Sequence, residues 1–592
     1  MRNGKDSSKK SGLDPHPAAT GLDRRDFLKS SLAVGATALV GAGMAGCAAV
    51  AHAEEPTGEP EIVTSSTEGL YGELPKDGFY VGPNATPVPP LPVPATWDDV
   101  ADVVVVGTGA GGCAATLYCA TKGQKVITVE KNPMCGGASA TATAFVCQGG
   151  TRAQNAAGLP FDIEALTTKY MGRIAYKPGL SQRKMTRQMI VKGPEAIDWF
   201  IDQGGPMKLT TPITYVATNE WDGERGVNAT NYASEKAVEL GADIRLETEC
   251  IRLIKEGERV VGIKVKELTS GLEYCIKGER GVILCAGGFT GNFDMLRRWC
   301  PSAAQTCKTA STFPGDDGLC VRLGQGAGAA MAGWDSFLAF DGGLDVGDWY
   351  HRIKEGDVQV ARQPWLGIDN RGNRYPYIAF ALEGWGSLFH QAQIFQGLPN
   401  STGYVFFDKN WEKNTLLFNE GGCRRGETPQ VISPHERTAV DPDDWTQGVR
   451  RGLERGHIKT ADNFADIATQ LDLDPAIVTE AVDKWNKMCE EGSDPDLGFD
   501  PLWLIPLKDP PFYGMVIGSQ LLATQCGLQV NENFEVLDEA GKAIPGFYAA
   551  TMTVGGVAGN NTNGSLSAPV GTLNLSWTTG YVAAQSILGE LG

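Results

Sequence analysis

The sequence is poor in the patterns that bind metals and haem. It contains six histidines, and no His/carboxylate motif such as HExxH. Its fourteen cysteines form no CxxC pair and no CxxCH motif, which excludes the usual zinc-finger spacings and a covalently attached c-type haem. We therefore expect no metal site, and we interpret most of the cysteines as buried free thiols.

Positive charge is also scarce. The chain has 52 Lys and Arg against 70 Asp and Glu, a net charge of −18. Because nucleic-acid binders need basic patches to displace counterions, we expect no nucleic-acid partner. Beyond residue 53 there is no continuous apolar run of about 18 residues, so we expect no membrane span in the mature chain.

Glycine, in contrast, is abundant. The 592 residues include 75 glycines, almost twice the usual share of ~7%. The hydrophobic share of 42% and the charged share of 21% are ordinary for a globular protein with a sizeable core. Glycine allows backbone to turn or to approach a ligand closely, so this composition favours tight loops around a bound molecule.

The first 53 residues are typical of an export signal. Arg24-Arg25 is followed by an apolar stretch to Val50 and by Ala51-His52-Ala53, which predicts a twin-arginine signal and a place in the periplasm or on the extracytoplasmic face of the cell membrane. The stretch is too rich in Gly and Ala to favour a membrane anchor. Lipid attachment at Cys47 is an alternative way of processing.

A strand, a glycine-rich loop, a helix, a second strand and an acid follow one another near the start of the mature chain. The strand is Asp102–Val106, the loop is 107–112, the helix is Cys113–Lys122, the second strand is Lys125–Val129, and the acid is Glu130. This order is the context that a GxGxxG motif needs to bind a dinucleotide.

Each part of this motif has a physical role. Gly107 permits the tight turn, Gly109 lets the backbone touch a pyrophosphate, and Gly112 lets helix and strand pack closely. The helix N-terminus that follows the loop attracts phosphate, so we expect Ala110 of the loop to contact the cofactor, and Glu130 accepts hydrogen bonds from ribose hydroxyls.

A second glycine patch follows at once, and it predicts FAD rather than NAD as the cofactor. We expect Gly137, Ala138 and Ser139 to contact FAD as it runs on towards its flavin.

From here the chain resembles the fumarate reductase/succinate dehydrogenase flavoprotein-like family of FAD enzymes, which includes exported urocanate reductases and the 3-ketosteroid dehydrogenases. The resemblance covers about residues 98–592 and rests on ordered motifs: GVILCAGGF at 281–289, GDDG at 315–318, IDNRGNRY at 368–375, GLQVN at 527–531 and IPGFYAA at 544–550. It implies that Asp317 contacts FAD and that a final helix near 572–588 presents its N-terminus to the flavin.

The resemblance also implies an α/β fold, with a discontinuous Rossmann-like FAD-binding domain and an inserted α+β capping domain. The boundaries that we predict are 1–53 for the signal, 54–97 for an extended lead-in, 98–337 for the first segment of the FAD-binding domain, 338–521 for the substrate capping domain and 522–592 for the second segment of the FAD-binding domain.

Two departures from the family fall in the second half of the cofactor site. The family's AAGE reads Ala549-Ala550-Thr551-Met552, which loses a glutamate, and the glycine-rich segment after it is altered. We still expect Ser567 and Ala568 to contact FAD.

Three further departures fall where the family clamps a dicarboxylate. Thr562 replaces the clamp arginine, the segment 522–528 has no histidine, and no arginine occurs from Tyr375 to Cys423, where the family places its proton donor near Leu382. Thr and Leu cannot replace a bidentate arginine–carboxylate pair, so we expect that fumarate is not the substrate.

The segment expected to line the substrate side is rich in aromatic residues, with a few polar groups. This combination suits a bulky, largely apolar or aromatic substrate with an activated C=C bond (an enone or enoate). The resemblance implies hydride transfer from flavin N5 and a proton from a side chain. The candidate catalytic residues are Tyr377 first, then Tyr375, His390, Arg374 and Tyr513.

The sequence leaves three kinds of function open. The first is a respiratory terminal reductase, which requires a separate cytochrome- or quinol-linked electron donor because no haem motif is present. The second is a flavin dehydrogenase of the 3-ketosteroid type that forms the C=C bond. The third is a flavin electron carrier without catalytic activity.

Overall fold

The computed structural model describes residues 83–142, 144–174, 183–211, 214–217, 225–310, 315–343, 365–375, 392–416, 449–450, 452–499, 501, 504–557 and 571–591. All of them belong to one compact unit, Ser65–Gly592. The twin-arginine segment and Cys47 lie outside the described residues.

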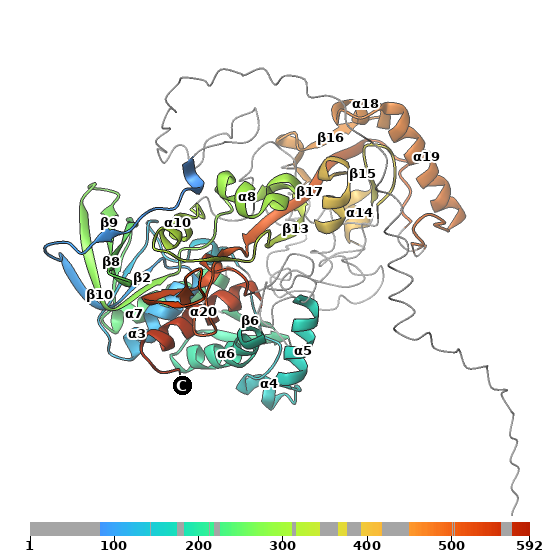
Figure 1. The fold of residues 1–592 in the computed structure, drawn as a ribbon. Coiled ribbons are helices and arrows are strands. Elements are labelled where there is room, and N and C mark those ends of the chain that lie inside the picture. The colour runs from blue at the N-terminus through green and yellow to red at the C-terminus, as the bar shows by residue number, and fades with distance from the viewer. Residues whose placement is uncertain are drawn as a thin grey trace, which may run out of the picture. The chain divides into compact units, whose positions relative to one another are not determined.

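The largest sheet contains five parallel strands in the order β20–β10–β2–β3–β7; β10 and β2 are labelled in Figure 1. Their bounds are β20 Ala543–Ala549, β10 Glu273–Leu284, β2 Asp99–Val106, β3 Val126–Val129 and β7 Asp243–Arg245. The apolar runs of β2 and β3 are buried, as is typical of parallel strands covered on both faces. The predicted α/β fold is therefore confirmed, and the strand expected at 102–106 starts at Asp99.

The same sheet continues beyond β10 with antiparallel strands. The first half of β10 pairs with β9 Arg259–Glu267, which pairs with β8 Thr248–Glu256. After a register shift between Gly278 and Gly281, the second half pairs with β2 and β20. β1 Leu91–Pro92 and β19 Glu535–Leu537 complete the sheet.

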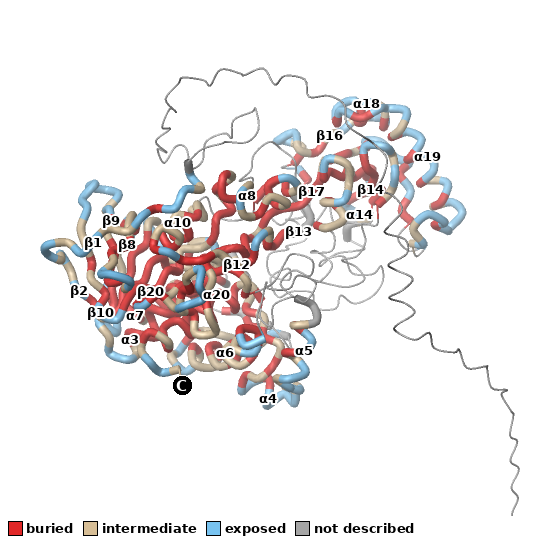
Figure 2. Tube along the Cα trace, in the orientation of Figure 1, coloured by how far each residue is buried: buried red, intermediate tan, exposed pale blue. Residues whose placement is uncertain are grey.

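Helix α3 Ala110–Thr121 lies beside α7 Arg225–Glu239 and α20 Thr572–Ile587, and almost all of its residues are buried (Figure 2). It starts at Ala110, three residues before the expected Cys113, and therefore includes Gly111 and Gly112. A Cβ on Gly111 would lie 2.6 Å from the carbonyl oxygen of Ser576 in α20. The missing side chains therefore let α3 pack close to its neighbours. The final helix expected near 572–588 is confirmed.

A second sheet is centred on β17 Phe512–Thr524. Its partners are β11 Cys307–Ala310, which is parallel to it, and the antiparallel β13 Phe337–Gly343, β15 Thr402–Asp408 and β16 Ile458–Ala461; β14 Leu366–Ile368 pairs with β15. β11 precedes residue 338, so this sheet joins strands from both sides of the predicted start of the capping domain.

Two helices pack on this sheet through a cluster that includes Phe406, Phe464 and Trp485. They are α18 Phe464–Gln470 and α19 Pro475–Glu491. The Asp474 side chain caps α19 by accepting a hydrogen bond from the Ala476 amide at 2.8 Å.

The remaining elements are a three-stranded sheet, a strand pair and further helices. β4 Phe145–Val146, β6 Thr214–Ala217 and β5 Met207–Thr211 form a three-stranded sheet, and β12 Met331–Ala332 pairs with β18 Gly527–Leu528. The other helices are α4 Arg152–Ala156, α5 Ile163–Ile174, α6 Arg183–Asp202, α8 Phe293–Trp299, α9 Pro301–Thr306, α10 Leu319–Gly326 and α14 Trp411–Leu416.

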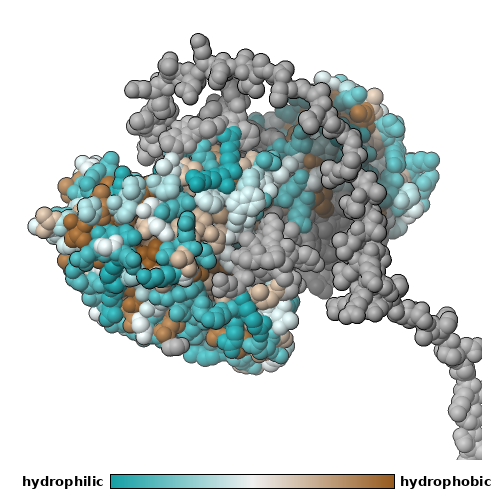
Figure 3. All heavy atoms as spheres, viewed as in Figure 1, coloured by the Kyte–Doolittle hydropathy of each residue, from teal (hydrophilic) through white to brown (hydrophobic). Residues whose placement is uncertain are grey.

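The described surface in Figure 3 is mainly hydrophilic, with scattered apolar patches. Exposed large hydrophobic side chains include Met134, Leu272 and Trp334. None of the described helices is long and apolar enough to cross a membrane.

Candidate cofactor and active site

The glycine loop between β2 and α3 is packed at both ends and open in the middle. Gly107 has φ +95°, and a Cβ on it would lie 2.8 Å from the Cys285 carbonyl oxygen. A Cβ on Gly112 would lie 1.9 Å from the Gly107 carbonyl oxygen. A Cβ on Gly109 would meet only Ser139 Oγ, at 3.6 Å. Protein therefore fills the space beside Gly107 and Gly112, whereas the space over Gly109 remains free for a ligand.

This free space lies at the N-terminus of α3. Gly109 is the N-cap residue and has no side-chain cap. The Ala110 amide donates to Ser139 Oγ at 3.1 Å, which brings the second glycine patch to the loop. Unpaired amides and the helix dipole make such a terminus a binding site for phosphate, so this loop fits the pyrophosphate of FAD.

Glu130 is buried at the carboxyl end of β3, and its orientation is fixed. One carboxylate oxygen accepts hydrogen bonds from the Thr108 amide at 2.8 Å and from Thr108 Oγ1 at 2.9 Å. The other accepts from the Asn132 amide at 3.0 Å and from Asn132 Nδ2 at 2.6 Å. The carboxylate is thus held beside the glycine loop, the place where a dinucleotide site uses an acid.

Lys131 joins this corner to the GDDG turn. Its Nζ lies 2.8 Å from the Asp317 carboxylate, and the other Asp317 oxygen accepts from the Leu319 amide at 2.9 Å. Burial is the largest single influence on Lys131 and lowers its pKa, but the charge of Asp317, its hydrogen bond to Lys131 and the nearby Glu249 together outweigh burial and raise the pKa to about 12. The fold therefore ties the GDDG turn to Lys131, the residue that follows Glu130, although the two segments lie far apart in the sequence.

The turn that follows Glu130 supplies backbone that is partly open to solvent. Gly136 and Gly137 both have positive φ, and a Cβ on Gly137 would meet no atom within 4 Å. Ala138 is exposed and Ser139 is half-buried. The predicted contacts Gly137, Ala138 and Ser139 thus lie together beside Gly109 and Ala110.

The N-terminus of α20 lies against β4. The Gly571 amide and Asn574 Nδ2 both donate to the Val146 carbonyl oxygen, at 3.0 and 3.1 Å. Gly571 is the N-cap residue and has no side-chain cap. Ser567 and Ala568, the other two predicted contacts, precede this helix and lie outside the described residues.

Sequence reasoning missed the groups that orient the predicted residues. They are Thr108, Asn132 and Lys131. Next to the predicted Asp317, Asp316 accepts hydrogen bonds from the Thr290 amide and hydroxyl at 3.1 and 2.8 Å. Burial raises the pKa of Asp316. Thr108 lies within the glycine loop and Lys131 follows Glu130 directly, and this placement is the signal that could have found them.

Among the catalytic candidates, Tyr377 and His390 lie outside the described residues. Arg374 forms a two-point ion pair with Asp494, at 2.8 and 2.9 Å. Its guanidinium lies 4.7 Å from the centre of the Trp485 ring and 4.9 Å from that of Phe499. The positive charge of Arg374 is therefore neutralised by Asp494.

The two described tyrosines lie in one aromatic cluster of the second sheet. Tyr375 is buried and packs edge-on against Phe395, and burial raises its pKa. Tyr513 is half-buried and stacks on Phe407, with ring centres 5.1 Å apart. Tyr375 and Tyr513 therefore share the cluster that also holds Trp365, and the side chain of Arg374 packs on α19 instead.

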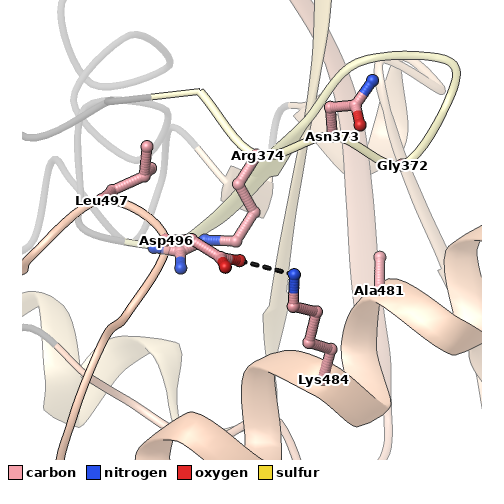
Figure 4. A pocket seen from close by; sticks show the side chains of 7 residues that line it. All are labelled: Gly372, Asn373, Arg374, Ala481, Lys484, Asp496 and Leu497. Carbon is pink, nitrogen blue, oxygen red and sulfur yellow. Dashed lines mark ion pairs between the residues drawn. The ribbon is translucent and has the colours of Figure 1, made fainter.

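Arg374 also lines the pocket that is drawn in Figure 4. Its lining is Gly372, Asn373, Arg374, Ala481, Lys484, Asp496 and Leu497. Lys484 and Asp496 form an ion pair of 2.7 Å in it. It contains none of the residues of the glycine loop. Within the described ranges, no group of three or more His, Cys, Asp or Glu side chains is placed to hold a metal ion.

The fold and the open glycine loop define a dinucleotide-binding flavoprotein. The family described as FAD binding domain matches residues 102–567, and the twin-arginine translocation pathway signal sequence matches residues 21–41. The chain belongs to this FAD-binding family. It is an FAD-dependent oxidoreductase and is exported by the twin-arginine pathway to the periplasm or the extracytoplasmic face of the membrane.

Relatives and solved structures agree with this assignment. The chain is 25% identical to the vinyl phenol reductase of Lactiplantibacillus plantarum over 476 residues, which cover 78% of this chain and 91% of the relative. It is 26% identical to the digoxin reductase of Eggerthella lenta over 582 residues, or 90% and 92% of the two chains. A flavocytochrome c3 fumarate reductase in an open conformation has a similar fold, with a TM-score of 0.61, 21% identity, and 83% and 80% coverage.

Proposed function

We propose that this enzyme reduces an activated C=C bond in a bulky, largely apolar or aromatic organic molecule. The observation that carries the proposal is the loss of the charged clamp in a chain that keeps the family's first dinucleotide-binding motif. Thr562, the histidine-free segment 522–528 and the arginine-free stretch 375–423 leave a dicarboxylate without its usual partners. The names of the relatives, a vinyl phenol reductase and a digoxin reductase, support a substrate of this class.

In the proposed site, residues from both ends of the sequence hold FAD. The α3 N-terminus, with Gly107, Gly109, Ala110 and Gly112, binds the pyrophosphate. Gly137, Ala138, Ser139, Asp317, Ser567 and Ala568 complete the binding residues. The dipole at the α20 N-terminus favours negative charge on the bound ring system.

Glu130 binds the adenosine ribose in this proposal. Its carboxylate already accepts four hydrogen bonds, which is about the number that its lone pairs allow. A ribose hydroxyl therefore replaces one side-chain donor, Thr108 Oγ1 or Asn132 Nδ2, while the two backbone amides keep the carboxylate in place.

Bound FAD supplies the hydride that reduces the electron-poor carbon of the alkene. We assign the proton donor for the adjacent carbon to Tyr377, with His390 as the next candidate. Tyr375 and Tyr513 are proposed to shape the aromatic wall through their shared cluster. Since Asp494 already neutralises Arg374, we propose that Arg374 positions this segment.

A separate protein supplies the electrons in this proposal. The sequence has no CxxCH motif, so a separate cytochrome- or quinol-linked protein is proposed to reduce the enzyme as a component of a respiratory chain.

An anaerobic reoxidation assay tests the reaction. Purified holoenzyme is reduced, mixed with single enones, cinnamates, vinyl phenols, steroids or fumarate, and followed by the return of the flavin's visible absorbance. We expect at least one bulky alkene to reoxidise the enzyme and fumarate to be inactive. Fast reoxidation by fumarate would contradict the substrate class.

Two other outcomes separate the remaining functions. Bleaching of the oxidised enzyme by a saturated ketosteroid would indicate the dehydrogenase direction, and no response to any organic compound would indicate an electron carrier. Tyr377→Phe is expected to slow the reaction about 100-fold or more without loss of bound flavin. Tyr375→Phe is the matched control, and it should retain most of the rate.

A further inference from the structure

Two buried cysteines from distant segments of the sequence lie against each other. Cys300 joins α8 to α9, and Cys526 follows β17 in the turn before β18. Both side chains are completely buried, and Cys526 lies close enough to Cys300 to raise the pKa of its thiol.

Neighbouring backbone contacts place the same segments together independently. The Cys300 thiol donates to the Ser336 carbonyl oxygen at 3.4 Å, and the Gln525 amide donates to the same oxygen at 2.8 Å. A Cβ on Gly333 would lie 3.4 Å from the Cys526 Cα. The turn 333–336 is thus held between the α8–α9 junction and the β17–β18 turn.

We propose that Cys300 and Cys526 form a disulfide bond after export. The enzyme folds while thiols are kept reduced and then enters a compartment in which disulfides persist. Each thiol loses a proton as the S–S bond forms, and the two electrons pass to a disulfide oxidant, which is cleaved to two thiols.

The position of this bond gives it a mechanical effect. Phe337 at the start of β13 pairs with Thr524 at the end of β17, so the chain leaves for the inserted segment and returns from it at one point. We call this pair, with Ser336 and Gln525, the root of the insertion. A disulfide bond between Cys300 and Cys526 would link the root of the insertion covalently to the α8–α9 junction.

Cys307 is an alternative partner for Cys300, but the length of α9 disfavours a bond between these two cysteines. Cys300 and Cys307 flank the two ends of α9, so a rise of 1.5 Å per residue puts their Cα atoms ~10 Å apart. A disulfide needs a Cα separation below about 7 Å. Cys307 therefore serves as the control position.

Formation of the bond is expected to be slow. Burial raises the pKa of the Cys300 thiol, and the neighbouring Cys526 thiol raises it further. Because the thiolate is the reactive form, the exchange requires local opening and proceeds faster as the pH rises.

The test uses the full-length holoenzyme, reduced and then incubated with oxidised glutathione. Free thiols are alkylated under denaturing conditions, and unreduced peptides are analysed by mass spectrometry. We expect one bridged peptide pair that contains Cys300 and Cys526, and a melting temperature higher by roughly 5 °C. Alkylation of both cysteines in the oxidised sample, or a bridge between other cysteines, would overturn the proposal.

Two variants complete the test. Cys307→Ser should keep the bridge and the rise in melting temperature, and Cys526→Ser should lose both. If Cys526→Ser fails to fold, the peptide map of the unmutated protein still decides the question. Flavin content serves as the check that the samples remain holoenzyme, so that failure of the proposed reaction is recognised separately.

Discussion

Gly580 in α20 lies directly on the backbone of Gly111 in α3: a Cβ at position 580 would be 1.9 Å from the Gly111 carbonyl oxygen. The two helices therefore touch through backbone (Figure 1). This contact joins the helix that starts at the glycine loop to the helix near the C-terminus.

The first prediction concerns this contact. Gly580→Ala must push α20 away from α3, so we expect a loss of about 1–3 kcal/mol in unfolding free energy and faster loss of FAD. Chemical denaturation and flavin release measure the two effects. Gly397→Ala is the control, because nothing lies within 4 Å of its added Cβ. An equal effect in both variants would contradict the packing argument.

The second prediction concerns the ribose site. Glu130→Ala removes the acceptor at the end of β3, and hydrogen bonds to a charged group contribute about 1.5–3 kcal/mol. We expect FAD to bind roughly 10- to 100-fold more weakly to the apoprotein, as measured by titration of flavin fluorescence. Glu235→Ala, at an exposed position on α7, should leave the affinity unchanged. Unaltered affinity in Glu130→Ala would remove Glu130 from the cofactor site.

The third prediction concerns Arg374 and Asp494. Burial raises the pKa of Asp494, but the hydrogen bonds from Arg374 and from backbone amides outweigh burial and lower the pKa from 3.8 to about 2. Because the folded-state pKa is the lower one, the pair contributes its full stability above about pH 4 and loses it as the pH falls through about 2.

Asp494→Asn leaves a buried guanidinium without its partner. We expect a loss of about 3–5 kcal/mol at neutral pH and a weaker pH dependence of stability below about pH 4, both followed by urea unfolding. Asp496→Asn is the matched control, since it removes only the more exposed ion pair with Lys484 (Figure 4) and should cost less than about 1 kcal/mol. Similar losses in the two variants would be the contrary result.

The fourth prediction concerns Thr551, which stands where the family has a glycine. It has φ +64°, a left-handed conformation that disfavours a β-branched side chain. Within the described residues its buried Oγ1 has no hydrogen-bond partner. Thr551→Gly should therefore stabilise the protein by about 1 kcal/mol.

Thermal unfolding of Thr551→Gly and Thr551→Ala separates the two causes. Alanine removes the unpaired hydroxyl but keeps a side chain at positive φ, so it should give a smaller gain than glycine. A lower melting temperature in both variants would show that the threonine side chain stabilises the fold and would contradict the prediction.

The sequence predicts the strand–loop–helix–strand–acid unit well, because its physics is local. Gly107 and Glu130 lie within one βαβ unit, and the spacing alone brings them together. The helix start is less well predicted: Gly111 and Gly112 are helical because α20 and the loop itself pack against them, and no local pattern shows those contacts.

Contacts between distant segments explain most of what could not be predicted. Arg374 matches a family motif, but its partner Asp494 lies 120 residues further along the chain, just after α19. Burial of Cys300 and Cys526 follows from their apolar surroundings, whereas their contact depends on the turn 333–336. Tyr377 and His390 stay predictions, since both lie outside the described residues.

The pairing of Phe337 with Thr524 has an evolutionary consequence. Because the chain departs and comes back through neighbouring positions of one antiparallel ladder, the intervening segment can be exchanged for another without rerouting the dinucleotide-binding strands. On the proposed function, a chimera that grafts a relative's segment between these two residues should acquire that relative's substrate preference.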